Sequence, residues 1–156
     1  LERQILVNQF KLLWAINEDS QYLKKAHILE CWATTFYKDA LTLKDEIPED
    51  IQNETMDILD MFYNIYNALE KLNDTQKTQL NLSILEFDGF DQRDDKHCWF
   101  HEFLHNIDRY NYIPLKNSHW PRLPLYRLML AQFKAGNILE ELDFERLKQL
   151  SEILIK

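Results

Sequence analysis

Glycine and proline are scarce in this sequence, which has only two glycines and four prolines among its 156 residues. An all-β protein is rich in tight turns, and these two residue types make many of them. Hydrophobic residues nevertheless account for 46% of the chain and aromatic residues for 13%, which is enough to build a core in a chain of this length. The sequence therefore predicts an all-α fold: a single compact domain over residues 1–156 with about six helices, a long central helix and little or no sheet.

Cysteine is also rare, and basic residues are outnumbered by acidic ones. Cys31 and Cys98 are the two cysteines of the chain, too few for a small domain that depends on disulfides, so we expect a cytoplasmic protein with reduced thiols. The 26 acidic and 18 basic residues give a net charge of -8, which repels phosphate backbones and anionic lipid surfaces. We therefore expect neither nucleic acid nor a membrane as a partner.

No long uninterrupted hydrophobic run is present in the sequence. The N-terminal stretch LERQILVNQFKLLWAI is interrupted by polar residues at Arg3, Asn8, Gln9 and Lys11. A signal peptide or a membrane span requires a continuous apolar segment. The stretch instead predicts an amphipathic helix, with an apolar face formed by Ile5, Leu6, Phe10, Leu13 and Trp14.

Capping residues and periodic apolar residues predict the next two helices. A second helix should begin at an N-cap supplied by Asp19 or Ser20 and continue to about Ala40. The longest periodic run begins at Pro48, where a proline is compatible with the first turn of a helix, and its apolar stripe extends to Leu72. This run predicts the long central helix.

The middle of the chain contains turn signals and a helix rich in histidine. Residues 73–79 are polar and predict a loop, and residues 80–85 predict a short extended or helical piece. In the sequence FDGFD, we expect Gly89 to adopt an unusual backbone angle and Asp91 to cap a helix that carries the histidines and ends near Tyr110.

The C-terminal part begins with a loop. Residues 111–124 hold three of the four prolines and predict a structured loop. A helix should follow over about residues 125–134 and end at Gly136 in the left-handed conformation that glycine tolerates. Asp143 is expected to cap a last helix that starts at residue 144.

The histidine helix contains a pattern that occurs in zinc enzymes. His101, Glu102 and His105 lie in the sequence H-E-F-L-H, and H-E-x-x-H on a helix is a metalloprotease motif. Two histidines one turn apart can bind the same Zn²⁺, and the glutamate can act as the base that activates a bound water molecule. One possible function is therefore a zinc-dependent hydrolase with His101 and His105 as ligands and Glu102 as general base.

A catalytic zinc also needs a third protein ligand, and the usual one is missing. In the extended motif H-E-x-x-H-x-x-G-x-x-H, Asp108 and Asn111 take the positions of the glycine and the last histidine. His119, Glu140 or Glu141 would have to fold back to complete the site. We therefore expect no cofactor, with zinc as the alternative.

The helical phase of the histidines points away from a metal site. At about 100° per residue, the histidines and Asp108 lie roughly 135° from the apolar residues of the same helix. The phase predicts that His97, His101 and His105 form a solvated stripe or a contact between subunits, and a contact of this kind would be sensitive to pH because histidine titrates near neutrality.

Three stretches of the sequence are distinctive: RQILVNQFKLLWAI at the N-terminus, FDGFD near the middle and NSHWPRLPLYRLMLAQF in the second half. Together they resemble the YfbU-like family of small bacterial proteins of uncharacterised function. The resemblance spans nearly the whole chain and implies a single, mostly helical cytoplasmic domain that self-associates. It implies no established activity, cofactor or catalytic residue, and it does not make the histidine helix a metal-binding helix. The matching positions are Asn8, Gln9, Phe10, Gly89, Phe90, Asp91, Asn117, Ser118, His119, Pro121, Leu123, Tyr126, Met129 and Leu130.

The third of these stretches has the composition of an anion site. Asn117, Ser118 and His119 precede a helix, and the N-terminus of a helix attracts anions through its backbone N–H groups and its dipole. Tyr126 and Arg127 in that helix would add a hydroxyl group and a positive charge. The alternative is that Ser118 and His119 only cap the helix and fix the loop. These five residues are the predicted ligand-binding residues.

Together these observations predict a non-enzymatic regulatory or protein-interaction module. We expect it to act as a homo-oligomer that forms its contacts through aromatic-rich faces, with an unknown protein partner. Two alternatives remain open: the zinc-dependent hydrolase, and a small-anion sensor built around residues 117–127.

Overall fold

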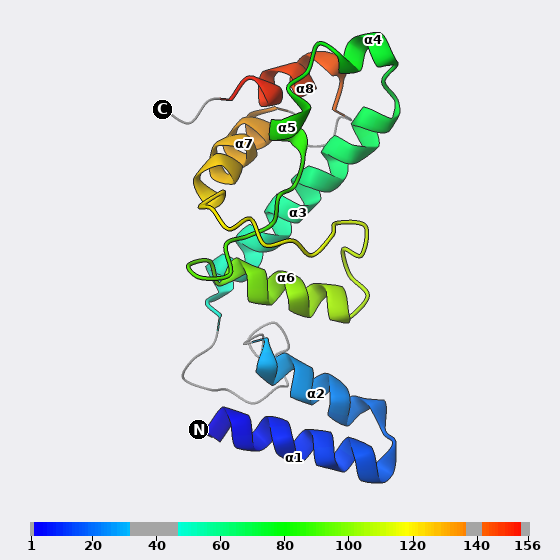
Figure 1. Ribbon diagram of the computed structural model, residues 1–156, viewed down its shortest axis with the longest axis vertical. Coiled ribbons are helices and arrows are strands. Elements are labelled where there is room, and N and C mark those ends of the chain that lie inside the picture. Colours follow the sequence, from blue (N-terminus) through cyan, green and yellow to red (C-terminus); the bar gives the residue numbers. More distant parts are fainter. Residues whose placement is uncertain (1, 32–46, 137–141, 154–156) are drawn as a thin grey trace. The chain divides into compact units, whose positions relative to one another are not determined.

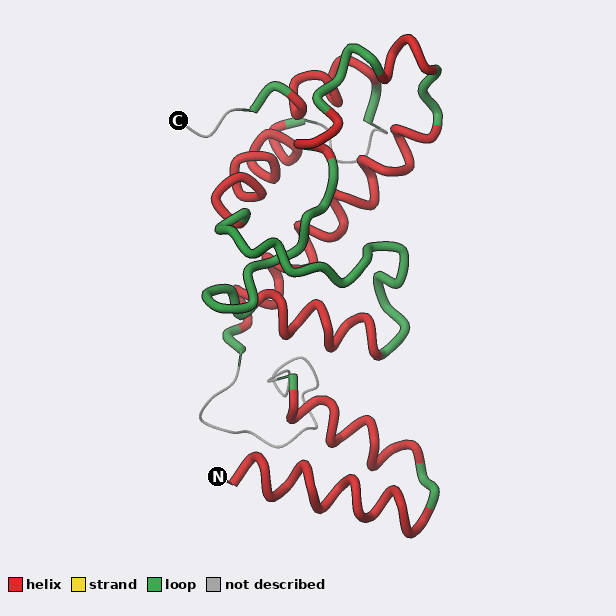
Figure 2. The backbone as a smooth tube through the Cα atoms, viewed as in Figure 1, coloured by secondary structure: helices red, strands yellow, loops and turns green. Residues whose placement is uncertain are grey.

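The computed structural model describes residues 2–31, 47–136 and 142–153. Within these ranges the chain forms eight helices and no strand, and its extended pairing is limited to an isolated bridge between Phe90 and Asn117 (Figures 1 and 2). The predicted all-α fold is confirmed, with more helices than expected because two short ones occur in the middle of the chain.

The chain divides into two compact units. Unit 1 contains Leu1–Thr55 and Lys96–Tyr110, and unit 2 contains Met56–Asp95 and Asn111–Lys156. Compact units of this kind occur within single domains as well as between domains, so the single-domain organisation stays a prediction. Each unit is described by itself below.

Unit 1 begins with a helical hairpin of α1 (Glu2–Asn17) and α2 (Ser20–Glu30), which lie side by side (Figure 1). Glu18 adopts a left-handed φ of 56° at the reversal. Asp19 is the N-cap of α2, and its Oδ1 accepts a hydrogen bond from the backbone N–H of Gln21 at 2.9 Å. The cap at Asp19 is confirmed, and the predicted continuation to Ala40 lies outside the described residues.

The hairpin packs around a small apolar core that differs from the predicted face of α1. Val7, Ala26 and Leu29 are buried, and Leu6 and Phe10 of the predicted face pack against them. The other three predicted core residues, Ile5, Leu13 and Trp14, are exposed. The prediction was wrong for them because α1 carries apolar residues on more than one side, and only the side that contains Val7 faces α2.

Unit 1 also contains α6 (His97–Asn106) and the first turns of α3 (Glu49–Glu70), the long helix that begins after Pro48 as predicted. The α6 helix is shorter at both ends than the sequence suggested. It starts six residues after Asp91, which is in unit 2 and accepts a hydrogen bond from the N–H of Arg93 instead of capping α6. It ends at Asn106, and left-handed φ angles at Asp108 and Tyr110 terminate the helical course.

Unit 2 contains the remainder of α3 with α4 (Asp74–Lys77), α5 (Leu82–Leu85), α7 (Leu123–Ala135) and α8 (Phe144–Ser151). The α8 helix packs against α5 and α7. The α4 turn lies in the segment that was predicted to be a loop. It forms because Asn73 and Gln76 make a reciprocal capping box that satisfies the first N–H groups.

The core of unit 2 is built largely from aromatic rings. Phe62, Phe87, Phe90 and Tyr126 are among its largest fully buried side chains. The ring of Phe62 packs edge-on against those of Phe87 and Tyr126, with centroids 5.1 Å apart in each pair, a favourable geometry for aromatic rings. Much of the aromatic content that suggested interaction faces therefore lies in the interior.

Gly136 does not adopt the predicted turn conformation and instead leaves room for a neighbouring side chain. Gly136 has a φ of -83°, so the predicted left-handed conformation was wrong. A Cβ atom at this position would lie 2.3 Å from Nη2 of Arg146 in α8. That Nη2 donates a hydrogen bond to the carbonyl oxygen of Phe133 at 3.2 Å. Gly136 therefore leaves space for the Arg146 side chain, which forms a hydrogen bond with the last turn of α7.

Candidate functional site

In unit 2, the second and third family-like stretches of the sequence contact each other where residues 87–92 lie against residues 116–120. We call this contact the interlocked turn. Gly89 has a left-handed φ of 96°, and a Cβ atom there would lie 2.0 Å from the carbonyl oxygen of Lys116. Next to it, the backbone N–H of Ser118 donates to the carbonyl oxygen of Phe90 at 3.3 Å. The predicted unusual angle at Gly89 is confirmed, and the close approach of a second backbone excludes a side chain there.

The hydroxyl groups of two tyrosines, one in α7 and one in α3, form hydrogen bonds with the backbone of this turn. The Tyr126 hydroxyl of α7 donates to the carbonyl oxygen of Gly89 at 3.1 Å and accepts from the N–H of Asp88 at 3.0 Å. The Tyr66 hydroxyl of α3 accepts from the N–H of Phe87 at 3.0 Å. Burial raises the pKa of both tyrosines, so both stay neutral over the physiological range.

The predicted anion-binding residues take part in the same interlocked turn. Asn117 Oδ1 accepts from the backbone N–H of His119 at 3.1 Å, and Asn117 Nδ2 donates to Oε1 of Gln92 at 3.2 Å. Ser118 Oγ donates to the carbonyl oxygen of Trp120 at 2.6 Å. These polar groups satisfy one another and the loop backbone, which is the loop-fixing alternative predicted from the sequence.

The structure does not gather all five predicted ligand residues at one point. The α7 helix begins at Leu123, its N-cap is Arg122, and no side chain caps it, so the predicted capping by Ser118 and His119 was wrong. Tyr126 is buried in the interlocked turn, whereas His119 and Arg127 are exposed. The anion site stays a prediction.

The histidines of α6 are placed differently from the predicted stripe. The side chains of His97 and His101 are buried, with 3% and 2% of their surface exposed, and His105 is half-buried. His97 Nε2 lies 2.8 Å from Oε2 of Glu54 in α3. The prediction of a solvated or subunit-facing stripe was therefore wrong for His97 and His101, which are both buried. For His97, α3 supplies a carboxylate inside unit 1 that the phase of α6 alone does not reveal.

The zinc alternative gains no further ligand from the described residues. Across residues 2–31, 47–136 and 142–153, no group of three or more His, Cys, Asp and Glu side chains has an arrangement that could hold a metal ion. Glu140 and Glu141 lie outside these ranges, and His119 belongs to the other unit. Glu102 is exposed while His101 is buried, so the proposed base and the first proposed ligand face different surroundings.

A cysteine and a histidine lie close together at the end of α2. Cys31 Sγ is 3.6 Å from His27 Nε2, and the His27 ring stacks on Phe103 of α6. Burial raises the pKa of the Cys31 thiol above its ordinary value of 9.0, and the nearby carboxylates of Glu102 and Glu30 raise it further. The thiolate is the reactive form of cysteine, so these surroundings favour an inert thiol over a nucleophile.

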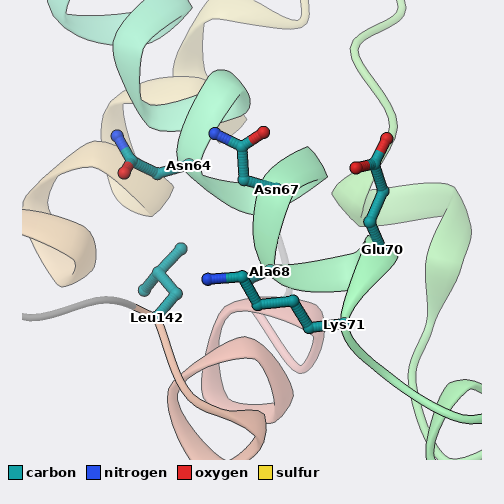
Figure 3. Close-up of a pocket in the computed structure, with 6 residues that line it drawn as sticks. All are labelled: Asn64, Asn67, Ala68, Glu70, Lys71 and Leu142. Carbon is teal, nitrogen blue, oxygen red and sulfur yellow. The ribbon is translucent and has the colours of Figure 1, made fainter.

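A cavity of about 420 Å³ lies beside the C-terminal half of α3 (Figure 3). The ammonium group of Lys71 points toward Leu142 at one wall, whereas the carboxylate of Glu70 points away from it. Four of the six lining residues are polar or charged, unlike a typical ligand pocket, which is mostly apolar. We assign no ligand to this cavity, which is lined by Asn64, Asn67, Ala68, Glu70, Lys71 and Leu142.

The α1–α2 hairpin of unit 1 exposes several large apolar side chains. Scattered exposed apolar residues are normal in proteins, but a row of them along one side of a helix marks an interaction surface. Ile5, Leu12 and Ile16 form such a row along α1, and we call them the hairpin patch. Sequence periodicity missed Leu12 and Ile16 because the buried face of α1 was assigned first, although both recur with Ile5 at helical spacing. Leu13, Trp14 and Leu23 are also exposed but do not belong to this row.

Comparisons with known proteins place this helical chain in a family. The YfbU domain family matches residues 1–152. The protein therefore belongs to the YfbU family. It is similar to the UPF0304 protein MJECS11 of Methanocaldococcus jannaschii, with 29% identity over 145 residues that cover 86% of each chain. No solved structure matches the sequence. Among the described helices, none combines the length and apolar character of a membrane span.

Proposed function

We propose that this YfbU-family protein is a non-enzymatic regulatory or protein-interaction module that acts as a homo-oligomer. The hairpin patch carries the proposal. Its α1 residues are accompanied by few charges, since Arg3, Lys11 and Glu18 are the only charged side chains between residues 3 and 18. An apolar surface with few charged residues matches the centre of protein–protein interfaces.

The polar groups of unit 2 support a structural role over a chemical one. The side chains of the interlocked turn donate to and accept from nearby backbone groups, as Tyr126 does with Asp88 and Gly89. A catalytic group needs instead to reach a substrate and to titrate near the working pH. The raised pKa of Tyr126 favours a group that holds the fold together.

The cysteines support a cytoplasmic location for the module. Cys31 and Cys98 are both buried in unit 1, and neither takes part in a disulfide. Proteins of oxidising compartments commonly use their cysteines in disulfides, whereas free thiols are typical of reducing compartments. The net charge of -8 agrees with a partner that is neither nucleic acid nor an anionic membrane.

Light scattering coupled to size exclusion tests the proposed self-association. Untagged protein is loaded at a series of concentrations up to the order of 100 μM, where even a weak dimer is populated. We expect the mass to rise to at least twice the chain mass of 18.9 kDa. A mass that stays at one chain throughout the series contradicts the proposal.

The zinc-dependent hydrolase and the anion sensor remain alternatives with their own tests. Zinc analysis, described in the Discussion, addresses His101 and His105. The anion sensor predicts that a phosphate or carboxylate metabolite raises the melting temperature, and that Arg127→Ala removes the effect. A melting temperature that phosphate and a panel of carboxylates leave unchanged contradicts the sensor.

A further inference from the structure

Four positions of α1 form one seam along the helix. Ile5, Gln9, Leu12 and Ile16 follow one another at spacings of four, three and four residues. At about 100° per residue, all four side chains project within about 60° of one another. Ile5, Leu12 and Ile16 are 47%, 62% and 76% exposed, and Gln9 is exposed as well. This spacing is that of the a and d positions that pair helices in coiled coils.

The positions beside the seam carry no charge. In the same register, Leu6 and Leu13 occupy e positions, and Asn8 and Ala15 occupy g positions. Coiled coils usually carry charged residues at the e and g positions, and these charges determine which partner helix is bound. In a two-fold symmetric dimer, both copies use the same surface for the contact. Glu2 occupies the a position before Ile5 and Asp19 the d position after Ile16, so both ends of the register are charged. Between Ile5 and Ile16 the seam is uncharged, which lets two chains of net charge -8 meet without like charges in this central part of the contact.

We propose that the α1 seam pairs with the α1 seam of a second copy of this chain. This inference rests on the self-association proposed above and names the surface that performs it. The α1 helix has 16 residues, which makes it about 24 Å long. Two helices of this length bury roughly several hundred Å² per copy, less than the ~800 Å² of a standard interface. We therefore expect a monomer–dimer equilibrium in the micromolar range.

Gln9 gives the pairing a distinctive signature. A polar residue at an a position of a coiled coil lowers its stability while it helps to specify the pairing. Replacing Gln9 with leucine should therefore strengthen the dimer, whereas most surface substitutions have no effect and most damaging ones weaken association. Misfolding gives larger aggregates and not a tighter dimer, so a folded Gln9→Leu variant that is still a dimer, but a tighter one, keeps the inference testable even if others unfold.

Sedimentation equilibrium of the full chain tests the seam with three variants. We expect Gln9→Leu to lower the dimer dissociation constant about 10-fold, and Leu12→Glu to raise it at least about 10-fold by placing like charges in the contact. Leu128→Glu is the matched control, because Leu128 is 48% exposed and lies on α7 of unit 2; it should leave the constant unchanged. Circular dichroism establishes that each variant is folded.

The outcomes separate the seam from the broader proposal. If the wild-type chain is a monomer at every concentration, both the self-association and the seam are wrong. If the wild type associates but Gln9→Leu and Leu12→Glu both leave the constant unchanged, the seam alone is wrong and another surface makes the contact. If Leu128→Glu weakens association as much as Leu12→Glu does, the contact is not specific to α1, and the seam is again wrong.

Discussion

The hydroxyl group of Tyr126 donates a hydrogen bond to the carbonyl oxygen of Gly89 at 3.1 Å, although the two residues are 37 positions apart in the chain. The same hydroxyl accepts from the N–H of Asp88 at 3.0 Å. One oxygen atom therefore satisfies both a donor and an acceptor of a tight turn, and it does so from inside the aromatic core of unit 2. This relationship fixes the second family-like stretch of the sequence onto the third.

Removal of this hydroxyl should destabilise the protein without a change of fold. Tyr126→Phe leaves the Asp88 N–H and the Gly89 carbonyl without their shared partner, which costs about 1–3 kcal/mol in the free energy of unfolding. Urea denaturation measures the loss. Tyr63→Phe is the control, since the Tyr63 ring is exposed and lies tilted against the ring of Tyr112, and it should change stability little. An equal effect of the two substitutions would show that the Tyr126 hydroxyl has no special role.

Stability should decrease in alkaline solution. The pKa values of Cys31, Tyr66 and Tyr126 are raised in the folded protein above their ordinary values of 9.0, 10.0 and 10.0. Below about pH 9 these groups are protonated in both states, so their contribution is complete. Above that pH the unfolded chain loses protons that the folded protein retains, and each group lowers the free energy of unfolding by up to about 1.4 kcal/mol per pH unit.

Urea denaturation between pH 8 and pH 11, with a thiol reductant present, measures this dependence. This pH range brackets the ordinary pKa values of cysteine and tyrosine, about 9 and 10. The free energy of unfolding of the wild type should fall with rising pH. In Tyr126→Phe the fall should be less steep, because one of the three groups is gone. A constant free energy across this range would be inconsistent with the burial of these groups.

Gly89 should tolerate no side chain. Alanine at this position would be strained at a φ of 96° and would meet the carbonyl oxygen of Lys116, a backbone atom with little freedom to move. We expect Gly89→Ala to lower the melting temperature by at least about 10 °C, which corresponds to a loss of several kcal/mol. Calorimetry measures the change.

The other glycine provides the comparison for this experiment. At Gly136 the obstacle to a Cβ atom is the guanidinium group of Arg146, the far end of a flexible side chain, and φ is in the ordinary region. Gly136→Ala should therefore cost much less than Gly89→Ala. A larger effect at Gly136 than at Gly89 would contradict the proposed interlock of the turn.

The zinc alternative can be decided by metal analysis. Because α6 lacks a third ligand among the described residues, we expect less than about 0.1 equivalent of zinc in untagged protein after expression with added zinc. Near-stoichiometric zinc that disappears in His101→Ala, but persists in the control Glu145→Ala, whose glutamate is exposed on α8, would establish a metal site and overturn the non-enzymatic assignment. Inductively coupled plasma mass spectrometry provides the measurement.

Local features of the fold could be predicted from sequence, whereas contacts between distant residues could not. Asp19 and Asp143 cap their helices as expected because each cap bonds to a backbone N–H two or three residues away. Gly89 was predicted for a similar local reason. In contrast, the burial of His97 accompanies a contact with Glu54, 43 positions away, and the role of Gly136 depends on Arg146 in another helix. No local pattern reports such contacts.

The exposed side of α1, which is the candidate interaction surface, also could not be predicted from the sequence. Periodicity identified α1 as an amphipathic helix but assigned Ile5 to the core, although Ile5 is exposed and Val7 is buried. Both sides of α1 carry apolar residues, and a sequence with two apolar sides does not indicate which one faces α2. The structure resolves this choice, and the side that remains exposed is the basis of the proposed function.

The most direct test of this account compares the molar masses of the wild-type protein and Leu12→Glu by light scattering at the same high concentration. We predict a mass that lies well above one chain of 18.9 kDa and approaches two chains for the wild type, and a mass close to one chain for a folded Leu12→Glu variant. A wild-type mass of one chain, or the same multimeric mass for both proteins, would contradict it.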